Sequence, residues 1–185
     1  MGLDMYLTAH IFVAGSDFVP AAEKTTYAAV VKACGISPTP DCPHLTIKIP
    51  VVYWRKANAI HRWFVDHCQD GNDDCHEAYV SREQLATLRD LCQQVADTVE
   101  TVEGDVKTGK TYRNGKVTQH TKKGRVICQT GLAEQLLPTQ EGFFFGGAEY
   151  DEFYLGDVEE TVEKLNRILD DGSLQNCDFY YQSSW

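Results

Sequence analysis

The architecture of this chain rests on Leu3-Asp4-Met5-Tyr6-Leu7-Thr8-Ala9-His10, in which apolar and polar side chains alternate. The apolar side chains fall on one face of the segment and the polar ones on the other. A period of two residues is typical of a β-strand with one buried face. We therefore expect this segment to form a strand that lies on the hydrophobic core.

Apolar periodicity and turn residues divide the rest of the chain. Helical spacing, together with end signals such as the capping box of Ser81 and Gln84, predicts helices over 21–34, about 56–68, 81–95, 132–137 and about 158–169. Strand patterns predict β-structure at 45–51, 138–147 and 179–181. Because Pro50 cannot donate a backbone hydrogen bond, we place it on an edge strand or at a strand end.

The length and composition predict a single α+β domain. The 185 residues are 43% apolar and 24% charged, as in an average globular domain with a sizeable core. We expect one compact domain over 1–185, in which a small mixed or antiparallel sheet is packed by about four helices. Asn114-Gly115 is a type I′ turn signal and predicts an inserted basic β-hairpin at 99–130.

The charge is unevenly distributed. The segment 106–125 holds seven Lys and Arg residues and no acid, whereas the rest of the chain has ten cations against 27 acids. An acidic body repels nucleic acid, so any such contact must be local to the basic hairpin, where Tyr112 is the single aromatic residue. We expect the hairpin to balance the acidic body or to contact a partner instead.

The cysteines indicate a reducing compartment, and the hydropathy indicates a protein outside the membrane. The seven cysteines are odd in number and scattered, which predicts free thiols that are mostly buried as small apolar side chains. The chain has no apolar run of the roughly 18 residues that a membrane span needs, and its start lacks the shape of a signal peptide. A cytoplasmic protein without membrane contact is the expectation.

Metal and cofactor signatures are weak. His67-Cys68 and Cys75-His76 place their donors next to each other, unlike zinc ligand pairs, and the acidic turn at 70–74 lacks the EF-hand spacing. No Walker loop, nucleophile elbow or dinucleotide fingerprint occurs in the sequence. We expect neither a metal nor a cofactor.

The segment from Tyr53 to Phe64, where a strand passes into a helix, carries the strongest functional signal. Arg55 and Lys56 are expected in the first helical turn, where cations oppose the helix dipole unless an anion lies among them. Asn58 and His61 fall on one helical face and add polar contacts. The alternative is that both cations pair with acids of this acidic chain.

Aromatic residues near glycines form the second functional signal. Gly146-Gly147 allows close backbone approach, and Phe144 and Tyr150 offer flat faces to a planar base. Phe143 and Phe145 are more simply explained as core residues of a strand. The aromatic chain end, Tyr180 to Trp185, is expected to be docked on the body, either for packing or to line a pocket.

Several blocks of the sequence carry a resemblance to a known group of proteins. They are Met1 to Leu7, Tyr53 to Val65, Tyr79 to Arg82, Leu136 to Gly146, Tyr150-Asp151 and Tyr180-Tyr181-Gln182-Ser183-Ser184-Trp185. Together they resemble a family of small uncharacterised proteins from bacteriophages and prophage-bearing bacteria. Some members carry the label phosphoglycerate kinase, whose length and nucleotide-binding motifs this chain lacks. The resemblance implies the cytoplasm of a bacterial host and a role in counter-defence, and it makes the hairpin an insertion.

These signals lead to one leading hypothesis and two alternatives. The leading hypothesis is a protein that holds an anionic, nucleotide-like ligand and so sequesters a host defence signal. Its expected ligand-binding residues are Trp54, Arg55, Lys56, Asn58, His61, Gln140, Phe144, Gly146, Tyr150, Gln182 and Trp185. The first alternative is an enzyme that modifies such a ligand, with His61 as general acid or base and Asp151 orienting it. The second is an acidic interaction protein without a ligand; homo-oligomer formation stays open.

Overall fold

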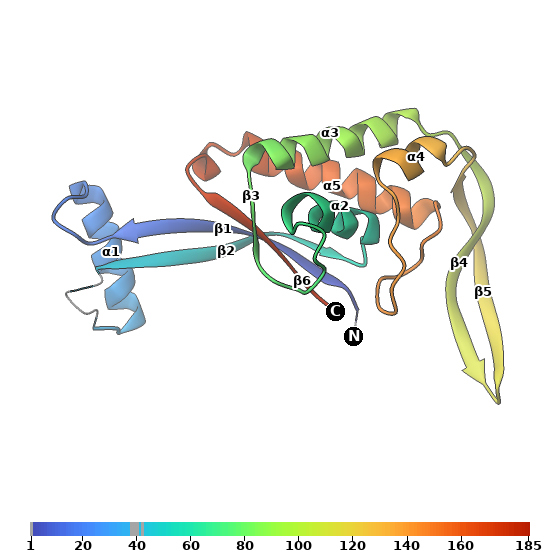
Figure 1. Ribbon diagram of the computed structural model, residues 1–185, viewed down its shortest axis with the longest axis horizontal. Helices are drawn as coiled ribbons and strands as arrows, with labels where there is room; N and C mark the ends of the chain where they lie inside the picture. The colour runs from blue at the N-terminus through green and yellow to red at the C-terminus, as the bar shows by residue number, and fades with distance from the viewer. Residues whose placement is uncertain (1, 38–40, 42) are drawn as a thin grey trace.

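A computed structural model describes residues 2–37, 41 and 43–185, and it has a mixed α+β fold as expected. A four-stranded sheet in the order β2-β1-β6-β3 forms the centre, and all its strand pairs are antiparallel. A second sheet consists of the hairpin β4-β5. Five α-helices lie in the described part of the chain, so the expectation of about four is close (Figure 1).

The alternating N-terminal segment becomes the inner strand β1 (Asp4–Ala14). It pairs with β2 (His44–Arg55) on one side and with β6 (Asp178–Ser184) on the other, and β6 also pairs with the short β3 (Ala78–Val80). The apolar side chains of the alternating segment, Leu3, Met5, Leu7 and Ala9, are completely buried, as the alternation predicts. The aromatic chain end is thus docked as a strand. Pro50 lies on the edge strand β2, at a register irregularity, which confirms its expected place.

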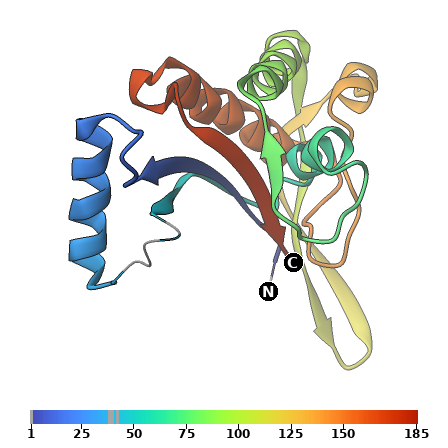
Figure 2. The same cartoon turned by 60° about the vertical axis from the view of Figure 1, so that its left-hand side comes forward.

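Helices cover one face of the sheet. Figures 1 and 2 show α3 (Arg82–Thr98) and α5 (Glu152–Asp170) side by side over it, with α2 (Asn58–Cys68) and the short α4 (Gly131–Leu136) beside them. The Ser81 capping box that starts α3 is formed in both directions. By contrast, α1 (Ala21–Cys34) lies against the far end of the β1–β2 ribbon and buries no residue. A 3-10 turn, Gly172–Leu174, leads into β6.

The hairpin consists of β4 (Thr101–Arg113) and β5 (Lys116–Ile127), and it projects from the body (Figure 1). Its turn residues Asn114 and Gly115 both have positive φ, which is what a type I′ turn requires. The base of the hairpin is joined to the start of α5 by a bridge between Val126 and Asp151. Whether the hairpin is an insertion stays a prediction.

The structure corrects two local expectations, one at the β2–α2 junction and one in the segment 138–147. Arg55 is the last residue of β2, and α2 begins only at Asn58, so neither Arg55 nor Lys56 lies in the first helical turn. The segment 138–147 is a loop with turns and not a strand. Side chains of α2 bind three of its carbonyl groups, those of Thr139, Phe145 and Gly147, in place of a neighbouring strand. Phe143 is 95% exposed in this loop and is not a core residue, whereas Phe145 is buried.

The expectation of mostly buried cysteines is wrong. Of the six described cysteines, only Cys92 is buried; Cys34 and Cys128 are exposed, and the others are partly exposed. All six are free thiols, and Cys42 lies outside the described residues. Composition alone cannot place a cysteine, because a small apolar residue is tolerated at the surface.

The buried face of β1 gives a test of the fold. Leu7→Ala is expected to lower the free energy of unfolding by about 3 kcal/mol, because a fully buried leucine leaves a cavity when it is truncated. Urea unfolding followed by circular dichroism measures the change. Phe18→Ala, at a ring that is 99% exposed, is the matched control and should change it by less than about 0.5 kcal/mol. Equal effects of both variants would contradict the placement of the core.

Candidate functional site

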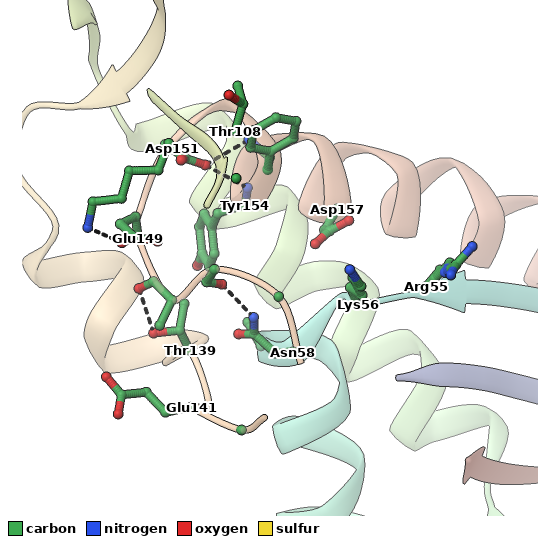
Figure 3. Close-up of a pocket in the computed structure, with 18 of the residues that line it drawn as sticks. Arg55, Lys56, Asn58, Thr108, Thr139, Glu141, Glu149, Asp151, Tyr154 and Asp157 are labelled. Atoms are coloured by element: carbon green, nitrogen blue, oxygen red, sulfur yellow. Dashed lines mark hydrogen bonds and ion pairs between the residues drawn. The ribbon is translucent and has the colours of Figure 1, made fainter. Parts of the chain in front are cut away.

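A cavity of about 1040 Å³ opens between the β2–α2 junction, the loop at 139–149, the hairpin and the first turns of α5 (Figure 3). Arg55, Lys56 and Gly146 line it together, although they are up to 91 residues apart in the chain. Lys107 and Lys110 of β4 add two further cations to the wall. The size of the cavity suits a ligand of nucleotide dimensions.

Lys56 enters this cavity from an unusual backbone conformation. Its φ is 61°, in the left-handed region, which costs a residue with a Cβ atom roughly 1 kcal/mol. Two hydrogen bonds fix it there: its N–H donates to the Leu3 carbonyl (2.8 Å), and its own carbonyl accepts from the Asn58 N–H (2.8 Å). Strain of this kind is typical of functional sites, where the surrounding structure holds it in place.

Gly146 is needed opposite Lys56 for two reasons. Its φ is 93°, which a residue with a Cβ atom rarely adopts. A Cβ atom at this position would also lie 3.3 Å from the Cβ atom of Lys56. The glycine therefore lets the loop approach the lysine closely, as the sequence suggested for this pair of glycines.

The two cations are largely free of carboxylates. The guanidinium Nε of Arg55 lies 3.8 Å from an oxygen of Asp4, a loose contact of an exposed pair. Within the described residues, Lys56 has no ion-pair or hydrogen-bond partner for its ammonium group. Among the described residues, a carboxylate thus contacts Arg55 loosely and none pairs with Lys56. The alternative, in which acids of the chain neutralise both cations, has little support.

Asn58 is a positioning residue of the cavity wall. Its amide nitrogen donates to the carbonyls of Phe145 (3.2 Å) and Gly147 (2.7 Å), and its oxygen accepts from the backbone N–H of Gln140 (3.0 Å). These three bonds occupy the side-chain amide and pin the loop to the start of α2. From the sequence we expected Asn58 to hydrogen-bond to a ligand. Such a bond would require the loop to give up its own hydrogen bonds to Asn58.

The acidic residues of the cavity differ in their roles. Glu149 forms an ion pair with Lys107, which joins the loop to the hairpin. Asp151 caps α5 by accepting from the N–H groups of Phe153 and Tyr154, and burial raises its pKa. Burial likewise raises the pKa of Asp157 to about 7. Asp157 therefore lines the cavity as a carboxyl group that is partly protonated at neutral pH.

A second polar cluster surrounds Asp73, outside the cavity. One carboxylate oxygen accepts from His61 Nε2 (3.0 Å) and Gln140 Nε2 (3.2 Å), and the other accepts from Trp185 Nε1 (3.0 Å). The other ring nitrogen of His61 lies 2.7 Å from the hydroxyl of Tyr181. Four segments of the chain, including its C-terminus, thus meet at one carboxylate.

The protonation of His61 follows from this geometry. Burial lowers its pKa, against the effect of Asp73, so the ring is neutral at pH 7. A carboxylate can only accept, so Nε2 carries the proton and Nδ1 accepts from the Tyr181 hydroxyl. Both ring nitrogens are engaged and the side chain is completely buried. The expected pairing of His61 with Asp151 is therefore replaced by a pairing with Asp73.

The remaining expected site residues lie outside the wall of the cavity. Trp54 is buried and donates to Thr161, Phe144 is partly buried against the core, and the Tyr150 hydroxyl accepts from the N–H of Thr139. Gln182 donates to the Cys75 carbonyl, and Trp185 packs edge-on against Phe145. They stabilise the fold around the cavity.

Sequence reasoning missed Lys107, Lys110, Glu141 and Asp157 of the cavity wall, and also Asp73 and two exposed aromatic rings. The sequence places Asp73 in the acidic turn at 70–74, and nothing in its spacing distinguishes it from Asp70 and Asp74. Phe143 and Phe153, which are 95% and 51% exposed, line the cavity in place of Phe144 and Tyr150. Because a tight turn separates Phe143 from Phe145, the sequence order of three phenylalanines could not show which one faces water.

Further searches of the molecule and of known proteins give three findings. The described residues include no group of three or more His, Cys, Asp or Glu side chains placed to hold a metal ion. None of the helices in the described part of the chain has the length and apolar character of a membrane span. Comparisons with protein-family models, curated proteins and solved structures find no match to this chain. The resemblance to phage proteins stays a prediction.

The Asp73 cluster predicts a large effect on stability. Asp73→Ala is expected to lower the free energy of unfolding by about 3 kcal/mol, because it leaves the buried His61 N–H and two further donors without an acceptor. Thermal unfolding measures the loss. Asp70→Asn, in the same turn and with a left-handed backbone that asparagine tolerates, should change stability by less than about 0.5 kcal/mol. A neutral Asp73→Ala variant would show that the cluster contributes nothing.

Asp157 predicts a pH dependence of stability. Its raised pKa means that the folded protein keeps a proton which the unfolded chain releases near pH 4, so stability is lost as the pH rises to about 7. Asp157→Asn cannot titrate and should be more stable than the wild type at pH 8, by about 1–2 kcal/mol for this partly exposed group. The gain should vanish at pH 4. Glu163→Gln, on the exposed side of the same helix, is the control, and a pH-independent gain would contradict the assignment.

Proposed function

We propose that this protein binds an anionic, nucleotide-like small molecule in the cavity between the β2–α2 junction and the hairpin. The observation that carries the proposal is the pair of weakly neutralised cations, Arg55 and Lys56, beside a wall of glycines and exposed aromatic rings. A guanidinium group and an ammonium group together supply charge-assisted hydrogen bonds to a phosphate or carboxylate.

The aromatic part of the ligand is suggested by Phe143. Its ring is 95% exposed and lines the cavity, as does the ring of Phe153. Base–aromatic stacking is worth about 1–3 kcal/mol per base and does not depend on the identity of the base. A nucleotide whose base stacks on Phe143 and whose anionic group binds Arg55 and Lys56 would use both the aromatic rings and the cations of the wall.

Retention of the ligand is favoured over turnover. Among the described residues that line the cavity there is no His, Cys or Ser, and His61 is buried elsewhere with both nitrogens engaged. Sequestration of a nucleotide-like host signal in the bacterial cytoplasm is the biological role that the phage resemblance adds to this proposal.

One observation favours an enzyme as the second candidate. A carboxyl group with a pKa near 7 is well matched to general base catalysis at neutral pH, and Asp157 lines the cavity with such a pKa. In that case Asp157 would take the role that the sequence suggested for His61 and Asp151. Mass spectrometry of nucleotides after incubation separates the candidates, because a binder returns its ligand unchanged.

Titration calorimetry with a panel of nucleotides tests the binding proposal. Arg55→Ala and Lys56→Gly should each weaken binding by about tenfold or more, since hydrogen bonds to charged groups contribute about 1.5–3 kcal/mol. Glycine is chosen at position 56 because it tolerates the left-handed backbone, so the loss of the ammonium group is measured without added strain.

Lys32→Ala provides the matched control for this experiment. Lys32 is an exposed cation in the last turn of α1 and does not line the cavity. Its removal should leave the affinity unchanged. A panel in which no nucleotide binds, or in which all three variants bind like the wild type, would rule the proposal out.

A further inference from the structure

The cavity is lined by charges of both signs. The cationic side chains are those of Arg55, Lys56, Lys107 and Lys110, and the acidic ones are those of Glu141, Glu149, Asp151 and Asp157. A polyphosphate is favoured most by a wall with a large excess of positive charge or a bound metal ion. Among the described residues this wall has neither, because its four cations face four acids and no group of side chains is placed to hold a metal ion. The balance of charges therefore restricts how much negative charge a ligand can carry.

Part of this charge is already committed within the protein. Lys107 and Glu149 form an ion pair with each other, and Asp151 accepts two N–H groups at the start of α5. Three cations then remain for a ligand: Lys56, Lys110 and the loosely paired Arg55. They are opposed by the carboxylate of Glu141 and by the partly protonated carboxyl group of Asp157.

The free charge of the wall is therefore small and positive. Among the described residues, Glu141 has no partner, and it stands at the turn that carries Phe143. A ligand whose base stacks on Phe143 lies close to this carboxylate. Figure 3 shows Asp157 on the side of α5 toward Lys56, so an anion held by Lys56 also lies near this carboxyl group. Acidic side chains thus lie on the wall near both parts of the proposed ligand, and they disfavour further negative charge.

We infer that the ligand of this cavity carries one or two negative charges, as a nucleoside monophosphate or a phosphodiester does, and that the acidic side chains of the wall reject di- and triphosphates. This inference rests on the proposed function and names the ligand class of the same site. It assigns Glu141 the role of a specificity-determining residue. The cations attract the anion, and the carboxylates limit its charge.

A charge series tests the inference. The nucleoside, the 3′,5′-cyclic monophosphate, the 5′-monophosphate, the diphosphate and the triphosphate of adenine, guanine, cytosine and uracil are titrated calorimetrically with EDTA, and again with Mg²⁺. Binding should be tightest for a monophosphate or a cyclic monophosphate, and weaker by about tenfold or more for the diphosphate and triphosphate, with or without Mg²⁺, because each added charge meets uncompensated carboxylates. Glu141→Gln should reduce this difference in affinity between the monophosphates and the di- and triphosphates several-fold.

Glu163→Gln, which removes one acidic charge from the exposed side of α5, is the matched control and should leave this difference in affinity unchanged. Affinity that rises from monophosphate to triphosphate, with or without Mg²⁺, would overturn the inference while the proposed function stands. A difference in affinity that Glu141→Gln leaves intact would overturn it as well. If no member of the series binds, the proposed function fails and this inference fails with it.

Discussion

The cavity of this protein depends on the side-chain amide of Asn58. Its two donated hydrogen bonds and one accepted hydrogen bond join the first turn of α2 to three backbone positions in the loop at 140–147. Without these bonds the loop would need other partners for its backbone groups, because a buried polar group without a partner is costly. The same bonds hold the loop on both sides of Gly146, so one side chain keeps the glycines of the wall beside Lys56.

His61, one turn after Asn58 on the same face of α2, connects the helix to a second set of partners. It connects Tyr181 of β6 to Asp73, and Asp73 also holds Gln140 and Trp185. Gln140 therefore joins Asn58 to Asp73, because its backbone N–H donates to Asn58 and its side chain donates to Asp73. We expect the effects on stability of substitutions at Asn58 and Asp73 not to be additive, since residues in one hydrogen-bond network do not act independently.

The sequence predicts the helices and strands better than it predicts the candidate site. Strand alternation at 3–10, the Ser81 capping box and Asn114-Gly115 each act locally, and each is present in the structure. The cation pair was recognised by residue type, yet its place at the helix start was wrong because a left-handed lysine leaves no pattern in the sequence. The partners of His61 could not be read either. Asp73 lies in the turn that follows α2, where Asp70 and Asp74 are equal candidates, and Tyr181 lies on β6, which the sheet topology brings to the helix.

The hairpin illustrates how structure changes the meaning of a charge cluster. In the described part of the chain, Lys107, Lys122 and Arg125 pair with acids on the loop and on α5, and Lys123 pairs with Asp105 on the facing strand. More than half of its seven cations are thus balanced within the protein, as the sequence suggested for an acidic body. Lys110 is turned to the cavity wall instead. A hairpin whose base is neutralised and whose side lines a cavity is better explained as a wall of the proposed binding site than as a nucleic-acid contact, which would need most of those cations to be free for phosphates.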